Sequence, residues 1–236
     1  MNGNAYSNPY VTAAEAGPIE RSRFIRLTYM HLAGAILAFT ALEAVFLNSA
    51  IAPAMMNLMV GGKFSWLIVL GLFMGVSWLA ESWARSGASI AMQYAGLALY
   101  VVAQAVIFIP LLYVAAFYSS PEIIPMAAMI TGGLFLGLTG VVVTTRIDFS
   151  FLRGVLVIGG FVALGVIVAS ILFGFNLGTF FAGAMVVFAA AAILYNTSGI
   201  FRDYRTDQYV AASLSLFASV ALLFWYILRI LLSFRR

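Results

Sequence analysis

Charged residues are scarce in this chain. Only 8% of its 236 residues are charged, whereas 64% are hydrophobic and the mean hydropathy is +1.07. Because soluble domains carry roughly a quarter charged residues, this composition excludes water as the main environment. Positions 154 to 201 hold no Asp, Glu, Lys or Arg. A single helix of that length would reach about 72 Å, more than twice the ~30 Å hydrocarbon core, so the segment crosses a bilayer twice.

Side chains used in catalysis are also few. The chain has no cysteine and one histidine, which excludes disulfides, thiolate metal sites and cysteine nucleophiles. It contains neither a GxSxG nor an HExxH motif, and no Asp lies inside an apolar segment, so we predict no enzyme and no metal site. The net charge of +4 comes mainly from arginines beside the apolar segments, a pattern typical of membrane topology and not of nucleic-acid binding.

The apolar segments predict an all-α, polytopic membrane protein. Lipid admits only helices and closed barrels, and the segments lack the alternation of barrel strands. We expect a polar, flexible tail over residues 1–20 and one seven-helix transmembrane domain over residues 21–236. The third segment is treated as one span that Pro110 breaks or kinks, followed by an aromatic belt. The seven predicted spans are Leu27 to Asn48, Phe64 to Leu79, Ser89 to Phe117, Ile123 to Thr145, Phe151 to Phe173, Leu177 to Ser198 and Tyr209 to Leu232, and the belt is Tyr113, Phe117 and Tyr118.

The distribution of basic residues predicts the orientation. With seven spans, eight basic residues fall on the side of the N-terminus and four on the other side. Cytoplasmic loops carry the excess of Lys and Arg, so we predict a cytoplasmic N-terminus and an external C-terminus.

Small residues recur within the spans. Gly133 and Gly137 form a GxxxG pair, and further small residues mark the fifth and sixth spans. This pattern predicts close helix packing, with a glycine-lined pore as the alternative. The further positions are Gly159, Gly160, Gly165 and Ala189 to Ala192.

Polar residues within or beside the spans are the candidate functional side chains, because each needs a partner in lipid. We expect His31 to have a hydrogen-bonded structural role and not to act as a proton relay. Glu43 is placed near the opposite face, where it is solvated, paired or a gate to a cavity. Glu81 and Arg85, one helical turn apart, are expected to pair at the surface, and Arg229 to extend toward the headgroups.

Asn196 lies about 9 Å of helix inside the sixth span. Ser215 on the seventh span lies at a similar estimated depth, whereas Ser219 lies deeper. Helical rise therefore favours a hydrogen bond between Asn196 and Ser215.

Three stretches of the C-terminal half are distinctive in combination, namely TTRIDFSFL at 144–152, ILYNTSGI at 193–200 and QYVAASLSLFASVALLFWYILRIL at 208–231. Together they resemble the Bax inhibitor family, especially its bacterial YccA-like branch. Arg146, Asp148 and Ser150 belong to the first stretch. The resemblance implies a seven-helix inner-membrane protein with the last helix central, and no cofactor.

Some proteins of this family are pH-sensitive calcium leak pathways gated by two Asp residues. The resemblance places these positions at Asn196 and Ser219, whose amide and hydroxyl groups have no charge to exchange. YccA-like relatives are instead partners or modulators of the membrane-bound, ATP-dependent FtsH protease. Two functions therefore remain open, a modulator of membrane protein quality control or stress response and a calcium or cation leak channel. The first is favoured because the acidic pair is absent.

Overall fold

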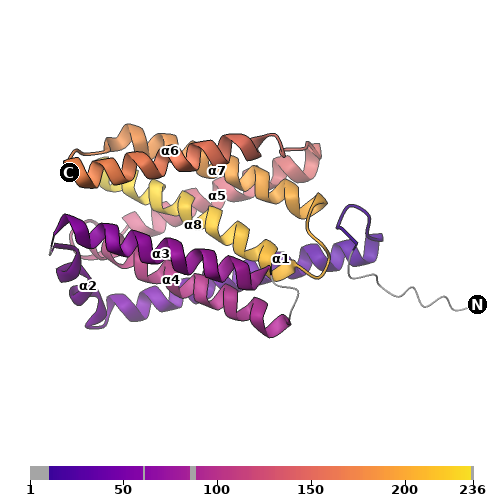
Figure 1. Cartoon of the computed structure of the whole chain (residues 1–236), viewed down its shortest axis with the longest axis horizontal. Helices are drawn as coiled ribbons and strands as arrows, with labels where there is room; N and C mark the ends of the chain where they lie inside the picture. Colours follow the sequence, from indigo (N-terminus) through magenta and orange to yellow (C-terminus); the bar gives the residue numbers. More distant parts are fainter. Residues whose placement is uncertain (1–10, 61, 86–88, 235–236) are drawn as a thin grey trace, which may run out of the picture.

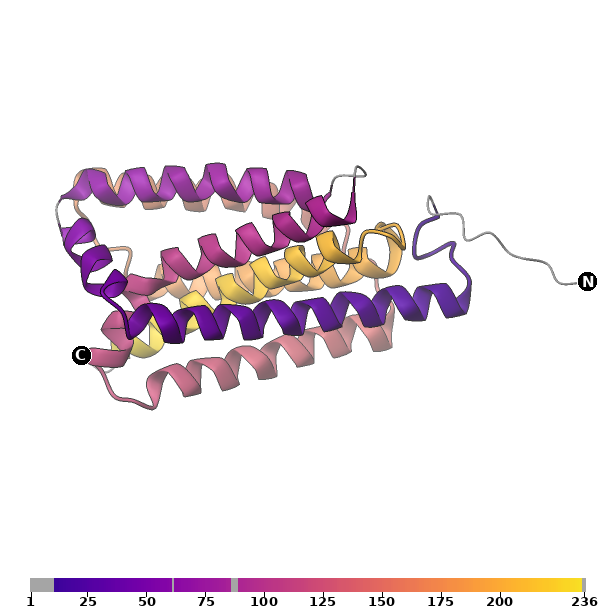
Figure 2. The same ribbon diagram turned by 90° about the horizontal axis from the view of Figure 1, so that it is seen from below.

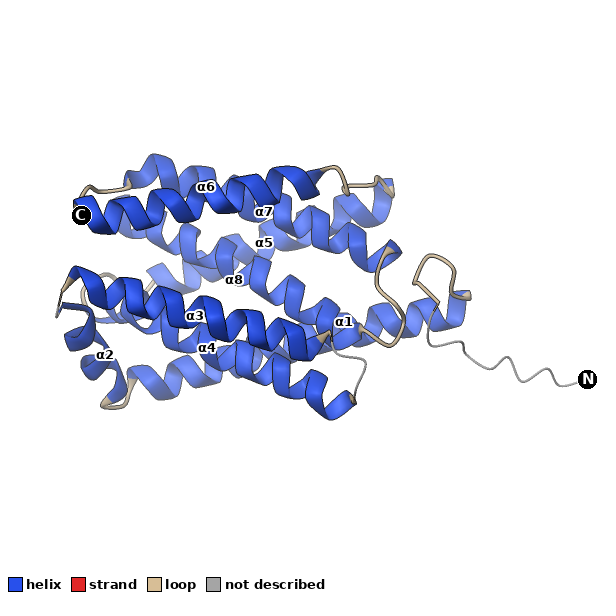
Figure 3. Cartoon of the chain, viewed as in Figure 1, coloured by secondary structure: helices blue, strands red, loops and turns tan. Residues whose placement is uncertain are grey.

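The computed structural model describes residues 11–60, 62–85 and 89–234, which form eight helices (Figures 1 and 3). Within these ranges the only β pairing is an isolated bridge between Thr12 and Arg205. Seven of the helices are long and apolar enough to cross a membrane, which confirms the predicted all-α, seven-span fold. The helices are α1 (Pro18–Leu47), α2 (Ile51–Val60), α3 (Lys63–Ala84), α4 (Ile90–Phe117), α5 (Ile123–Thr145), α6 (Leu152–Phe173), α7 (Gly178–Arg202) and α8 (Tyr209–Phe234).

The N-terminal part of the bundle differs from the prediction in two places. Helix α1 begins at Pro18, nine residues before the predicted span, because proline at the first helical position already has a helical φ and needs no amide donor. Helix α2 was not predicted. Its 10 residues reach about 15 Å, too short to cross a bilayer, and it packs against α1, α3 and α4.

Helix α4 is one continuous span of 28 residues with Pro110 inside it. Of the predicted break or kink at Pro110, the break is therefore wrong, and the single third span is confirmed. Pro110 is buried among the packed helices, and such packing is what allows proline inside a transmembrane helix. Near the end of α4, the Tyr113 ring lies 4.7 Å from that of Phe117 and 6.0 Å from that of Tyr118.

The last helix, α8, is central. It packs against α1, α3, α4, α5 and α7, and Figures 1 and 2 show it crossing between two groups of helices. This arrangement confirms what the resemblance implied. Helix α6 is peripheral, with Ala163 its one buried residue and α3 and α7 as its main neighbours.

Aromatic rings connect α8 to its neighbours at mid-height. The ring of Phe108 on α4 meets those of Phe39 on α1 and Trp225 on α8 edge-on, at centroid distances of 5.1 and 4.9 Å. The Phe217 ring lies 6.0 Å from Phe39 and 6.1 Å from Tyr100. Edge-to-face pairs at these distances are favourable beyond their buried area, so three helices share one aromatic layer.

Basic residues collect at the end of the bundle where α1 begins and where the α5–α6 and α7–α8 loops lie (Figure 1). We call it the arginine-rich end. The residues are Arg21, Arg23, Arg26, Arg85, Arg146, Arg153, Arg202 and Arg205. Helix α8 finishes at the opposite end, as an odd number of crossings requires.

Part of the predicted flexible tail is folded against this end. The Ala13 N–H donates to Tyr204 O at 2.9 Å, the Thr206 N–H lies 3.4 Å from Val11 O, and Ala13 is fully buried. The tail boundary at residue 20 is therefore corrected, because backbone pairing with the α7–α8 loop fixes residues 11–17. Residues 1–10 lie outside the described residues, so their flexibility stays a prediction.

The glycines that allow close packing are partly different from those predicted. A Cβ atom on Gly133 or Gly137 would meet nothing within 4 Å, so this GxxxG pair is not a contact within the chain, and the same holds for Gly165. Gly159 does pack closely, since a Cβ there would lie 3.0 Å from the Phe188 ring. The tightest position is Gly96, where a Cβ would lie 2.5 Å from Ala80 O.

We expect Gly96→Ala to lower the free energy of unfolding by about 1–3 kcal/mol, because the methyl group would push α4 away from the backbone of α3. Gly133→Ala is the matched control, and its added methyl group meets no atom of this chain. Thermal unfolding in detergent measures both variants. Equal unfolding temperatures would show that the α3–α4 crossing tolerates the extra atom.

Candidate functional site

The polar contact at the centre of the bundle joins α7 to α8. Asn196 Nδ2 donates to Ser219 Oγ at 2.8 Å and to Ser215 O at 3.3 Å. The Ser219 hydroxyl in turn donates to Ser215 O at 3.0 Å. Ser219 is 4% exposed. These hydrogen bonds therefore satisfy polar groups that neither lipid nor the apolar side chains around them could hydrogen-bond.

The partner of Asn196 differs from the one that helical rise favoured. Ser219 supplies the side-chain oxygen, and Ser215 takes part through its backbone carbonyl. Rise measures depth along one helix axis and does not give the crossing angle or the offset between two helices. The positions matched by the resemblance, Asn196 and Ser219, are the two whose side chains meet.

Tyr204 extends this network toward the arginine-rich end. Its hydroxyl lies 2.8 Å from Ser215 Oγ, and that oxygen lies 3.2 Å from Ala211 O as a donor. Ser215 therefore donates to α8 and accepts from Tyr204. Tyr204 is a functional candidate that was not predicted, although its position two residues after α7 was a signal that it could fold back on the helix pair.

The residues of the TTRIDFSFL stretch form a turn that holds the α5–α6 loop to the end of α7. Arg146 ends α5 in the left-handed conformation with φ 54°, and its carbonyl accepts from Arg202 Nη2 at 3.2 Å. Asp148 forms an ion pair with Arg202 and accepts from the Ser150 N–H at 2.9 Å. The Phe149 N–H donates to Ser198 Oγ at 3.2 Å.

The Ser150 N–H, and then the Arg202 guanidinium, hold the pKa of Asp148 below its ordinary value. A depressed pKa means that this turn gains stability from the carboxylate above the ordinary Asp pKa and loses it as the pH falls through the folded-state value. Because both side chains are partly exposed, the contribution is small. The turn thus gives a small, pH-dependent connection between the α5–α6 loop and the end of α7.

His31 is hydrogen-bonded on both ring nitrogens. Nδ1 lies 2.7 Å from Leu27 O, and Nε2 lies 2.7 Å from the Tyr94 hydroxyl. A carbonyl can only accept, so Nδ1 carries a hydrogen and a neutral ring accepts from Tyr94 at Nε2. The ring also packs 5.0 Å from that of Tyr209. His31 thus ties α1 to α4 and α8, the bonding expected of a structural role.

Glu43 is buried inside α1, with 5% of its surface exposed. Neither carboxyl oxygen has a hydrogen-bond partner among the described residues, and the ion pairs of this part of the chain do not involve Glu43. Of the alternatives in the sequence analysis, solvation at the surface and pairing are therefore wrong. Spacing along α1 could not reveal this burial, because it depends on how α1 packs against the other helices of the bundle.

The remaining polar candidates are peripheral. Glu81 and Arg85 are both exposed, and the described contacts contain no ion pair between them, so the predicted surface pair is not formed. Exposed pairs gain little over separate hydration, which explains the difference. Arg229 lies half-buried in the last part of α8, and its predicted reach toward the headgroups stays a prediction.

Comparisons with known proteins place the chain in a family. The family profile described as "Inhibitor of apoptosis-promoting Bax1" matches residues 21–236. The chain belongs to the Bax inhibitor family. An uncharacterized protein of Pasteurella multocida is 31% identical over 209 residues, 87% of each chain. No solved structure matches the chain at comparable stringency.

Two further relatives of this Bax inhibitor family protein match over shorter regions. An uncharacterized protein of Pseudomonas aeruginosa is 37% identical over 110 residues, 46% of this chain and 49% of the relative. An uncharacterized membrane protein of Vibrio cholerae is 32% identical over 124 residues, 50% of this chain and 53% of the relative. The chain thus spans about half the length of these two relatives, and none of the three names states an activity.

The site of this Bax inhibitor family protein is a polar contact between two helices. The family is not a known enzyme family, and the described residues contain no group of three His, Asp or Glu side chains that could hold a metal ion. What the Asn196–Ser219 contact can do chemically is to donate and accept hydrogen bonds, since an amide and a hydroxyl carry no titratable charge near neutral pH.

We expect a double-mutant cycle of Asn196→Ala and Ser219→Ala to give a coupling energy of about 0.5–2 kcal/mol, typical of hydrogen bonds between transmembrane helices. Unfolding in mixed micelles provides the free energies. The control cycle pairs Asn196→Ala with Ser213→Ala, because the Ser213 hydroxyl donates to Val210 O within α8. Couplings of equal size in both cycles would contradict the specific α7–α8 bond.

Proposed function

We propose that this protein is a non-enzymatic interaction protein of the bacterial inner membrane. In this proposal it belongs to the YccA-like branch and modulates membrane protein quality control or a stress response, as a partner of an FtsH-type ATP-dependent protease. The C-terminal motifs that resemble the branch support it. So does the charge count, which predicts that the arginine-rich end faces the cytoplasm.

The observation that carries the proposal is the uncharged hydrogen bond between Asn196 and Ser219. Two carboxylates in these positions would share a proton and repel each other once both are ionised, and that repulsion could separate α7 from α8. An amide and a hydroxyl keep the same hydrogen bond across the physiological pH range. A permanently joined α7–α8 pair favours a role in protein contacts over a proton-operated gate.

The N-terminal segment supports an interaction with a protease. Its backbone pairs with the α7–α8 loop through Ala13 and Tyr204. A partner that pulls on residues 1–10 would therefore also pull on the loop that leads into the central helix α8. ATP-dependent proteases engage unstructured termini. Residues 1–10 contain three Asn residues and single Gly, Ser and Pro residues, and have the composition of such a segment.

We expect deletion of residues 2–10 to lengthen the half-life of the protein in cells and to weaken its co-purification with the protease complex. The fold is kept because the pairing of residues 11–13 remains. A chain with a Gly/Ser segment of the same length in place of residues 2–10 is the control, and it should keep fast turnover if the protease needs length and not sequence. Unchanged turnover together with no association would count against the proposal.

Glu43 favours a second candidate, a calcium or cation leak. An ionisable residue inside the membrane is costly and marks ion pathways in many membrane proteins. The Glu43 carboxyl is 5% exposed and its two oxygens lack hydrogen-bond partners among the described side chains. A cation passing along α1 would supply the missing partner.

Flux of calcium into dye-loaded liposomes separates the two candidates. Under the first proposal, we expect wild-type vesicles to take up calcium no faster than protein-free vesicles at any pH tested. In the same assay, Asn196→Asp combined with Ser219→Asp should produce flux that rises with pH, because two ionised carboxylates repel across the α7–α8 contact.

The control for this assay is Glu43→Gln, which keeps the shape of the side chain and removes its charge. Wild-type flux that Glu43→Gln abolishes would replace the first proposal with the second. Wild-type flux that persists in Glu43→Gln would exclude Glu43 as the ion's partner.

A further inference from the structure

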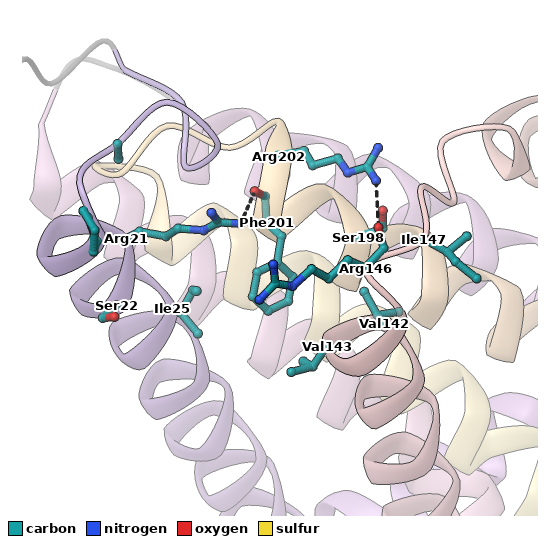
Figure 4. A pocket seen from close by; sticks show the side chains of 12 residues that line it. Arg21, Ser22, Ile25, Val142, Val143, Arg146, Ile147, Ser198, Phe201 and Arg202 are labelled. Atoms are coloured by element: carbon teal, nitrogen blue, oxygen red, sulfur yellow. Dashed lines mark hydrogen bonds between the residues drawn. The ribbon is translucent and has the colours of Figure 1, made fainter.

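A cavity of about 430 Å³ lies at the arginine-rich end, between the start of α1 and the ends of α5 and α7 (Figure 4). Three arginines line it, one from each helix, together with two serines. They are Arg21, Arg146, Arg202, Ser22 and Ser198. The helices are held together by the apolar core, which lies deeper in the bundle. The three guanidinium groups are therefore not needed for helix packing.

The three arginine side chains differ in how many hydrogen bonds and ion pairs they form within the protein. Arg202 is paired with Asp148. Arg21 donates to Phe201 O at 3.4 Å and lies over the Phe201 ring at 6.0 Å, which uses few of its five N–H donors. The Arg146 guanidinium has no hydrogen bond or ion pair among the described contacts, and Figure 4 shows it extending across the cavity toward Phe201 and α1.

The start of α1 adds positive potential to the same cavity. Ala16 and Pro18 are lining residues, and the N-cap Gly17 has no side chain to cap the free amides of the first turn. A helix N-terminus with unsatisfied N–H groups attracts anions. Glu20 lies in the same turn but does not line the cavity, so the lining carries three positive charges and no negative one.

The deeper wall of the cavity is apolar. Ile25 on α1 faces Val142 and Val143 on α5 (Figure 4). Val143 is 49% exposed, so this wall is open to the surroundings of the bundle, which for a transmembrane helix are lipid. A ligand that fits both parts has an anionic head and a hydrocarbon chain.

We propose that this cavity binds the phosphate of an anionic phospholipid. The Arg146 and Arg21 guanidinium groups bind the phosphate oxygens, which planar fork donors match well, and the Ser22 hydroxyl supplies a further donor. An acyl chain lies along Ile25 and Val143. Free phosphate shares the head chemistry, but the apolar wall selects the lipid. This site is independent of the proposed function, and it would tie α1 to α5 where few side chains do so.

Native mass spectrometry of the full chain in detergent tests the site, with phosphatidylglycerol, phosphatidylcholine and inorganic phosphate as separate probes. We expect wild-type protein to retain phosphatidylglycerol in preference to phosphatidylcholine. Arg146→Gln should retain about fivefold less, the loss of roughly one charge-assisted hydrogen bond at a partly exposed site. Its fold is kept, because the Arg146 carbonyl and not its side chain holds Arg202.

Arg153→Gln is the matched control, since Arg153 is exposed at the same end and does not line the cavity; it should retain lipid as the wild type does. Ser22→Asp is a second variant, which places a negative charge at an exposed position of the lining and should give the same loss as Arg146→Gln. Unfolding temperatures without lipid show whether each variant is folded.

Three results would overturn the proposal. The first is phosphatidylglycerol retention unchanged in both Arg146→Gln and Ser22→Asp. The second is equal retention of phosphatidylcholine, which would mean that the headgroup charge is not recognised. The third is retention of inorganic phosphate that matches retention of phosphatidylglycerol, which would identify a site for a free anion and not for a lipid.

Discussion

The hydrogen bond from Asn196 to Ser219 joins α7 to the central helix α8, against which α1, α3, α4 and α5 also pack. In a bilayer, apolar side chains gain little by leaving lipid for protein, so helix association depends on close packing and on interhelical hydrogen bonds. The backbone carbonyl of Ser215 receives two donors in the same contact. The position of α8, and with it the shared aromatic layer around Phe108, follows from this satisfied polar contact and the packing beside it.

Polar groups have different surroundings at the arginine-rich end and in the interior of the bundle. At the arginine-rich end, Asp148, Arg202 and the pairing of Ala13 with Tyr204 hold three loops together through charges and backbone groups. Water and lipid headgroups are available there, so an arginine such as Arg146 can remain without a protein partner. Glu43, deeper in α1, has no such access. An unpartnered cation at an interface is a binding surface, whereas an unpartnered carboxyl in the interior is a cost that implies a second state or a ligand.

Glycine patterns predict that a helix has a smooth face, but they do not predict which neighbour that face contacts. GxxxG predicts close approach, yet Gly133 and Gly137 face away from the other helices of this chain, while the close crossing forms at Gly96 against Ala80. A motif identifies a smooth helix face but not its direction, since rotation about the helix axis depends on every neighbour. The same limit applies to Asn196, whose partner was shifted by one turn, and to Tyr204, whose contact needs a loop conformation that no periodicity encodes.

By itself, the sequence determined the environment, the helical class and the seven crossings, because these depend on the length and apolarity of each segment measured against the thickness of a bilayer. It also determined which residues are polar inside lipid, and hence which could matter. The tertiary structure alone decided that Asn196 meets Ser219, that Glu43 is buried without a partner, and that three arginines surround one cavity. Those facts depend on the angles and offsets between helices, which arise from side chains packing across the bundle and not from spacing along the chain.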